Sequence, residues 1–236
     1  MENKKIDEVV LLAGGFGRRL KKISQGKPKP LMTIYKNLSI LDLIIKKLKK
    51  NRFKIFLAIC YKKKLFINKY KNEKNLKIVS EKVPLGTGGA IKNCISKIKK
   101  DSFLVINCDT LSNINYLDFI NFYKKKNINK KILIGGSHVK NTRRFGKLKI
   151  NHNNLLTGYY EKSLVSKKGW INNGSYILSK KFLKKKEKKF SFENDILSKE
   201  YRKNNVFVFK IYKDNFIDIG IPIDYEKALK KFSKKK

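Results

Sequence analysis

Glycines and basic residues follow the first apolar run of the sequence in a pattern suited to phosphate binding. The run VVLL at residues 9–12 leads into AGGFGRRLKKISQGKPKPL, which contains Gly14, Gly15 and Gly17. Glycines let a backbone approach a ligand closely and present its N–H groups to phosphate oxygens. Arg19 and Lys29 follow, and the prolines on either side of Lys29 restrict where it can point. The segment therefore predicts fixed positive charge beside a bound phosphate.

Two common nucleotide-binding motifs do not fit this segment. A dinucleotide fingerprint would need a third glycine where Leu20 stands, and an acid after the second strand, where the sequence reads YK. A P-loop would need Ser or Thr in place of Pro28. The glycine loop must therefore serve another kind of phosphate chemistry.

Two aspartates at the ends of apolar runs are candidate ligands for a divalent cation. Asp109 ends the run FLVINC, and Asp218 lies in FIDIG. Mg²⁺ binds carboxylate, phosphate and water oxygens, but an Asp at a strand end is also a common helix cap or turn former. The chain has only 18 Asp and Glu residues, so each carboxylate that could hold a metal is informative.

Motifs along almost the whole chain resemble those of the sugar-phosphate nucleotidyltransferases, which make nucleoside-diphosphate sugars from a nucleoside triphosphate and a sugar 1-phosphate. The first is LAGGFGRRL followed by PKPL. EKVPLGTGGAI, INCDT, YEK, INNGSYIL, SFENDIL and FIDIGIPIDY follow in the family's order. The set is most similar to the guanylyltransferases that act on D-glycero-D-manno-heptose 1-phosphate, and next to those that act on mannose 1-phosphate.

The resemblance implies roles for particular residues. Arg19, Lys29 and Lys162 would be catalytic, and Asp109 and Asp218 would hold Mg²⁺. The implied nucleotide-binding residues are Leu12, Ala13, Gly14, Gly15, Gly17, Glu81, Pro84, Gly86, Thr87 and Gly88. The implied substrate-binding residues are Glu161, Lys162, Asn172, Gly174 and Glu193.

The chemistry of Glu81 favours guanine as the base. Guanine offers an N1–H and an N2 amine side by side, and a carboxylate accepts hydrogen bonds from both. Uracil and thymine present one donor between two acceptors, which an amide serves better. The alternative for Glu81 is an exposed charge at a strand end. GTP is therefore the expected nucleotide, with UTP as the alternative.

Several positions depart from the family's pattern or carry a second interpretation. Cys108 stands where the family usually has Gly, Arg18 where it has Thr, and Asn173 where it has a small residue. Glu193 lies in S-F-E, which is also typical of a capping segment before a helix.

The charge of the chain suggests a second class of function. Lys and Arg number 58 against 18 Asp and Glu, a formal net charge of +40, and such an excess favours nucleic-acid partners. The lysines are spread along the chain and form no single stripe, so a solvated coat on an enzyme is preferred, with no nucleic-acid or membrane partner. A basic nucleic-acid-binding protein without catalysis remains the alternative, and the oligomeric state is left open.

The order of apolar runs and helical periods predicts an α/β fold. Strands are expected at 9–12, 55–60, 76–80, 103–108 and 131–135, with helices at 39–50, 63–70, 89–99 and 116–126 between them. This alternation predicts a doubly wound, mostly parallel sheet, with ligands at the carboxyl ends of its strands. A hairpin near 145–162, strands at 174–178 and 206–212, and helices at 192–202 and after Pro222 are expected to follow.

The domain organisation and location follow from the same features. We expect one Rossmann-like nucleotidyltransferase domain at 1–230, with a nucleotide-binding half at about 1–110, a sugar-binding half at about 111–230 and a basic tail at 231–236. Its 41% hydrophobic residues suffice for a core. The three cysteines lack C-x-x-C spacing, and the charged N-terminus is untypical of a signal peptide, so a cytoplasmic location is expected.

Overall fold

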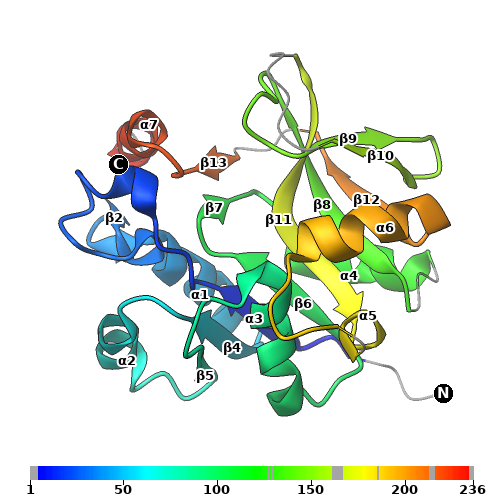
Figure 1. The fold of residues 1–236 in the computed structure, drawn as a ribbon. Coiled ribbons are helices and arrows are strands. Elements are labelled where there is room, and N and C mark those ends of the chain that lie inside the picture. The colour runs from blue at the N-terminus through cyan, green and yellow to red at the C-terminus, as the bar shows by residue number, and fades with distance from the viewer. Residues whose placement is uncertain are drawn as a thin grey trace.

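The structure is a computed structural model that describes residues 5–126, 128, 130–160, 167–184, 186–212 and 216–233, with Arg18 described by its backbone alone. Its centre is a nine-stranded sheet with the order β10-β9-β11-β6-β1-β4-β5, in which β8 also pairs with β11, and β12 pairs with β8 (Figure 1). The strands of this sheet are β1 (Glu8–Leu12), β4 (Lys54–Ile59), β5 (Leu76–Ser80), β6 (Ser102–Asn107), β8 (Ile132–Val139), β9 (Lys147–Ile150), β10 (Leu156–Tyr160), β11 (Gly169–Ser179) and β12 (Val206–Ile211).

The first half of the chain forms the parallel part of the sheet. Strand β1 pairs in parallel with β4 on one side and β6 on the other, so that Val10 lies opposite Phe56 and Val105. These strands are almost continuously apolar because helices cover both of their faces. The strand order reverses at β1, and the loops after β1 and β6 therefore leave the sheet side by side. This is the place where doubly wound sheets bind ligands.

Strand β11 makes the sheet mixed. It runs antiparallel to β6, β8 and β9, whereas β8 and β12 pair in parallel. The strand expected at 174–178 is the second part of β11, which has 11 residues. The first residues of β11, before 174, pair with β8 and β9. The expected hairpin is formed by β9 and β10. The mostly parallel α/β class is confirmed, and the antiparallel pairings are those of β11 and of the β9–β10 hairpin.

Helices pack on both faces of the sheet and form two hydrophobic clusters (Figure 1). Alternate residues of β1 divide between them: Val9 and Leu11 face one cluster and Val10 faces the other. Helices α1 (Ile40–Lys50), α2 (Lys63–Tyr70), α4 (Tyr116–Lys125) and α7 (Pro222–Ser233) contribute to the first cluster, and α3 (Gly86–Cys94) to the second. A capping box at Ser39 and Asp42 begins α1.

The helical segment expected at 192–202 is irregular. It begins with a π-helical turn at Glu193–Leu197, continues as α6 (Ser198–Glu200) and ends in a 3-10 turn at Tyr201–Lys203. A short α5 (Lys181–Lys184) precedes it. Within the described ranges, no helix combines the length and the apolarity that a membrane crossing requires.

Two small antiparallel sheets were not expected from the sequence. One joins β2 (Thr33–Tyr35) to β3 (Leu38–Ser39), and the other joins β7 (Thr110–Leu111) to β13 (Ile217–Asp218). Their strands have two or three residues, too few to show a hydrophobic period. The β7–β13 pair matters for the site, because it brings a late segment of the chain to the carboxyl end of β6.

Candidate active site

The glycine loop follows β1 and lies against Lys29. Gly17 has a φ of +61°, and a Cβ built there would lie 3.3 Å from the Cβ of Lys29. Any other residue would therefore be strained and would displace the lysine. Gly15 has no heavy atom within 4 Å of its would-be Cβ, so its backbone is open to an incoming ligand. The two glycines thus serve different purposes in the loop.

Lys29 brings the two predicted metal ligands together. It begins a 3-10 turn at Lys29–Leu31, and its side chain is only 10% exposed. Its Nζ lies 2.8 Å from Oδ2 of Asp109 and 3.3 Å from Oδ1 of Asp218. The two aspartates lie 80 and 189 positions from Lys29 in the sequence, yet the three residues form one cluster of charges.

The β7–β13 pair sets the position of Asp218. Asp218 lies opposite Thr110, and the backbone N–H of Ile219 donates to the carbonyl of Asp109 at 3.3 Å. Cys108, the departure from the family's Gly, extends the parallel ladder by donating its backbone N–H to Leu12 at 3.1 Å. Its thiol is fully buried, and burial raises its pKa well above the usual value, so it packs as a small neutral side chain.

The donor set fits a hard divalent cation. Both aspartates aim one oxygen at the same point, which the Lys29 ammonium holds in this structure. Among the described residues no group of three or more His, Cys, Asp or Glu residues could hold a metal. Mg²⁺ binds proteins through one or two carboxylates and completes its shell with phosphate oxygens and water. Asp109 and Asp218 match this way of binding, in which the protein supplies only part of the coordination shell.

A pocket of about 200 Å³ lies between the glycine loop and this cluster. Arg19 is exposed and lines it together with Lys29 and Asp109. The other lining residues are Leu12, Ala13, Gly15, Gly17, Pro30 and Gly220. Most of the residues predicted from the first motif, together with Asp109, therefore surround one basic pocket.

Glu81 is buried beside the glycine loop. Only 4% of the residue is exposed, and Oε2 accepts a hydrogen bond from the backbone N–H of Leu85 at 2.9 Å. Its other oxygen, Oε1, would lie 3.5 Å from a Cβ at Gly14. Burial raises the pKa of the Glu81 carboxyl, and the hydrogen bond from Leu85 and the charge of Lys63 oppose that rise. Glu81 is thus no solvated strand-end charge. Pro84, in the same loop, is exposed.

The glycines of the GTGG segment accommodate protein and not only ligand. Gly86 has a φ of +74°, and its would-be Cβ would lie 2.5 Å from the carbonyl oxygen of Phe190. A Cβ at Gly88 would lie 2.1 Å from the Phe190 ring. The N-terminus of α3 is therefore packed against the segment before Glu193, which comes from the second half of the chain.

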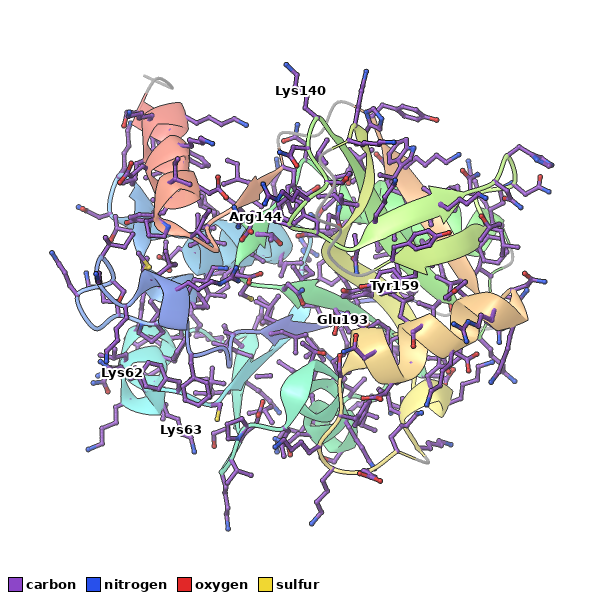
Figure 2. All side chains as sticks on the ribbon, turned by 45° about the horizontal axis from the view of Figure 1, so that its top comes forward. Lys62, Lys63, Lys140, Arg144, Tyr159 and Glu193 are labelled. Carbon is purple, nitrogen blue, oxygen red and sulfur yellow. The ribbon has the colours of Figure 1, made fainter. Side chains whose placement is uncertain are left out.

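Glu193, which Figure 2 labels, connects the GTGG segment to the turn at Asn172–Gly174 through hydrogen bonds. Its Oε2 accepts a hydrogen bond from the Thr87 hydroxyl at 2.5 Å, and its Oε1 accepts from the Tyr176 hydroxyl at 3.1 Å. The Tyr176 oxygen in turn accepts from Nδ2 of Asn172 at 2.9 Å. Glu193 therefore has protein partners on both oxygens, a role that its capping-segment interpretation did not include.

The turn at Asn172–Gly174 is built from its own side chains. Oδ1 of Asn172 accepts from the backbone N–H of Gly174 at 3.0 Å, so its contacts with the described residues leave one N–H and one lone pair of the amide for a ligand. Gly174 has a φ of +80°, and its would-be Cβ would lie 2.8 Å from Asn107. Asn173 is buried, and its Oδ1 accepts from Ser175 at 3.0 Å. Asn173, which is bulkier than the small residue usual in the family, is thus packed inside the protein.

Two further predictions lie outside the described residues. Glu161 and Lys162 follow β10 directly, beyond its last residue Tyr160. The side chain of Arg18 also lies outside the described part. The roles that the family resemblance implies for Glu161 and Lys162 stay predictions.

Sequence reasoning missed Arg144. It lies in the connection between β8 and β9, and its Nη2 lies 2.8 Å from Oδ2 of Asp218 while Nη1 contacts Asp224. A larger cavity of about 820 Å³ is lined by Arg144, Asp218 and residues of α7. In the sequence, the only signals for this contact are Arg144 itself, which precedes Phe145 and Gly146, and Asp224, which follows Asp218 by six positions.

Comparisons with known proteins identify the family of the chain. The family model described as "Nucleotidyl transferase" matches residues 8–235. The chain is 34% identical to the D-glycero-alpha-D-manno-heptose 1-phosphate guanylyltransferase of Campylobacter jejuni subsp. jejuni serotype O:2, over 92% of this chain and 96% of that protein.

Solved structures extend the agreement to the fold. The crystal structure of HddC from Yersinia pseudotuberculosis covers 96% of this chain and 100% of its own, with a TM-score of 0.83 and 37% identity. A second structure of HddC, complexed with GMP-PN, gives a TM-score of 0.82 and 36% identity. The family expected from the motifs is confirmed: the chain belongs to the nucleotidyl transferase family of enzymes.

Proposed function

We propose that this protein transfers a guanylyl group from GTP to a sugar 1-phosphate and releases pyrophosphate. The sugar that we favour is D-glycero-D-manno-heptose 1-phosphate. The observation that carries the proposal is the buried carboxyl of Glu81, which lies beside the glycine loop with Oε1 near Gly14. A carboxylate at the base site suits the two adjacent donors of guanine. The heptose guanylyltransferase of C. jejuni and the complex of HddC with GMP-PN support this assignment.

The reaction needs positioning and charge neutralisation. An oxygen of the sugar phosphate attacks the α-phosphorus of GTP, a new P–O bond forms, and the bond to the β-phosphate oxygen breaks as pyrophosphate leaves. Arg19 and Lys29 hold the crowded phosphate oxygens together, since both line the pocket beside the glycine loop. A bound Mg²⁺ would add neutralising charge to those oxygens. Asp109 and Asp218 would hold it, and Lys29 would turn toward phosphate.

The sugar half rests on fewer contacts. We assign Asn172 and Gly174 to the sugar, because the Asn172 amide keeps one donor and one acceptor available. Glu161 and Lys162 would bind a hydroxyl and the sugar phosphate respectively. Glu193 would act through Tyr176 and Thr87, which it contacts.

The test is pyrophosphate release over a grid of four nucleoside triphosphates and several sugar 1-phosphates, including the manno-heptose, mannose, glucose and N-acetylglucosamine compounds. GTP should exceed UTP and CTP by roughly ten- to a hundredfold in kcat/KM, with the heptose 1-phosphate highest. Asp218→Asn is the inactive control.

Each alternative has its own outcome in this grid. Equal or greater activity with mannose 1-phosphate would change the sugar and keep the reaction. Activity with UTP and N-acetylglucosamine 1-phosphate, and none with GTP, would contradict both the base and the sugar. No release with any pair, together with DNA binding at physiological salt, would favour the non-catalytic alternative.

A further inference from the structure

Arg144 lies between Asp218 of β13 and the first turn of α7 (Figure 2). Its side chain is 30% exposed, and its guanidinium contacts two carboxylates with two different nitrogens: Nη2 contacts Asp218 and Nη1 contacts Asp224. The chain brings these residues together from the β8–β9 connection, from β13 and from α7. Arg144 therefore ties three separate elements at one point.

The two oxygens of Asp218 have different partners. Oδ2 accepts from Arg144 at 2.8 Å, whereas Oδ1 lies 3.3 Å from the ammonium of Lys29. A carboxylate is planar, so a partner that fixes one oxygen also fixes the direction of the other. Arg144 thus turns Oδ1 toward the point where Asp109 also aims an oxygen. Contacts of this kind orient the ligands of metal sites.

The guanidinium is itself held in place. It lies 5.7 Å from the centre of the Phe145 ring, and Phe145 packs edge-on against Phe216 at 5.2 Å. Asp224, its second carboxylate, lies in the first turn of α7, where a negative charge also favours the helix dipole. An arginine holds two acceptors in a fixed fork, which the single ammonium of a lysine does not reproduce.

We propose that Arg144 is a positioning residue that orients the Asp218 carboxylate toward a divalent cation, with Asp224 as its anchor. This inference rests on the proposed function, because the cation is the Mg²⁺ of the nucleotidyl transfer. Arg144 acts through Asp218 and does not itself touch the reacting phosphates.

The experiment compares Arg144→Gln, Arg144→Lys and Asp224→Asn with the wild type. Arg143→Gln is the matched control, since Arg143 precedes Arg144 in the chain and lines the same cavity. The first measurement is Mn²⁺ binding to the protein alone by electron paramagnetic resonance. Loss of a contact that orients a metal ligand typically costs about 10- to 100-fold in metal affinity. Arg144→Gln should weaken Mn²⁺ binding by at least about tenfold, Arg144→Lys by less, and Arg143→Gln not at all.

The second measurement is pyrophosphate release against Mg²⁺ concentration. Arg144→Gln should raise the half-saturating Mg²⁺ by a factor of about ten or more, while the KM for the sugar 1-phosphate stays nearly constant. The double variant of Arg144→Gln and Asp224→Asn should bind Mn²⁺ no more weakly than Arg144→Gln alone, because Asp224 acts through Arg144.

The outcomes separate this inference from the proposed function. A lower melting temperature with unchanged Mn²⁺ affinity would make Arg144 merely structural and overturn the inference, as would a wild type that binds no Mn²⁺. If the wild type releases no pyrophosphate with any substrate pair, the proposed function fails. The Mn²⁺ measurement then still decides the role of Arg144.

Discussion

At the residue scale, Lys29 is both a catalytic candidate and a competitor for the metal. Its ammonium bridges Asp109 and Asp218, and its side chain is 10% exposed. Two carboxylates this close repel one another, so the ammonium compensates their charge when no other cation is bound. A divalent cation between them would displace Lys29 toward the phosphates, where the same positive charge serves the reaction.

Replacing Lys29 should separate these two roles. Lys29→Met removes the competing cation, so Mg²⁺ should bind the protein more tightly, by roughly tenfold, as measured by isothermal titration calorimetry. Turnover should nevertheless fall by about 100-fold or more, because positive charge at the reacting phosphorus is lost. Lys27→Met, at an exposed position two residues earlier, is the control. Weaker Mg²⁺ binding or unchanged turnover in Lys29→Met would contradict this account.

Glu81 shows a cost of the proposed base selectivity. Burial raises the pKa of its carboxyl in the folded protein. The folded state therefore holds a proton more readily than the unfolded state, and stability declines as the pH rises through the folded-state pKa. The ionised carboxyl that would pair with guanine is thus a destabilising group in the empty protein.

Glu81→Gln should therefore raise stability and lower selectivity together. The amide stays neutral, so the variant should melt above the wild type at pH 7 to 8, and the difference should vanish below roughly pH 4, where both are neutral. The preference for GTP over UTP should narrow by about tenfold. Scanning calorimetry against pH and kcat/KM ratios measure the two effects. Glu226→Gln, on the exposed face of α7, should change neither. A variant less stable at every pH would refute the account.

At the element scale, similar glycines have different structural reasons. The start of α3 is packed against the backbone and ring of Phe190, which requires glycine at 86 and 88. The loop after β1 keeps Gly15 open toward the pocket. Of the two glycine-rich segments, the loop after β1 thus leaves open space beside a pocket, whereas the start of α3 makes room for a neighbouring segment of the protein.

Alanine at these positions should separate stability from binding. Gly86→Ala should lower the free energy of unfolding by about 1–2 kcal/mol or more. The φ of Gly86 is +74°, and the new Cβ would lie 2.5 Å from the carbonyl oxygen of Phe190. Gly15→Ala should leave the free energy of unfolding unchanged, because the added Cβ meets no other atom of the protein. It should weaken nucleotide binding, because the Cβ would enter the pocket that Gly15 lines. Urea unfolding and nucleotide titration are the measurements. Equal stability losses in the two variants would contradict these assignments.

At the scale of the whole molecule, the net charge of +40 is carried by a coat of side chains. Figure 2 shows nitrogen-tipped side chains pointing outward around the outline of the molecule. Such charge favours anions of every kind over short distances and is screened by salt. The site differs from this coat because its Lys29 is buried and paired, with defined partners.

The nine-stranded sheet also determines which parts of the chain meet. Strand β11 joins the second half to β6, and the segment of Phe190 returns to cover α3. The GTGG segment at the start of α3, which is expected to bind nucleotide, is therefore held partly by the half that is expected to bind sugar. Chain order alone would have kept these two segments apart.

The sequence by itself determined the elements and the family. Apolar runs and helical periods are local signals, so β1, β4, β5 and β6 and the helices between them were predicted to within a few residues at most boundaries. Arg19, Lys29, Asp109 and Glu81 were identified because they stand in motifs that resemble those of the family, and the chemistry of guanine gave a further reason for Glu81.

Only the tertiary structure decided how those residues meet. The β7–β13 pair has two residues in each strand, too few for a pattern, yet it places Asp218 beside Asp109. The fork of Arg144 and the packing of Gly86 on Phe190 join residues that lie 74 to 104 positions apart in the sequence. Such contacts depend on which surfaces the sheet brings together, and no local property of the chain encodes them. The sequence therefore determined which chemical groups are present, and the tertiary structure determined their partners and orientation.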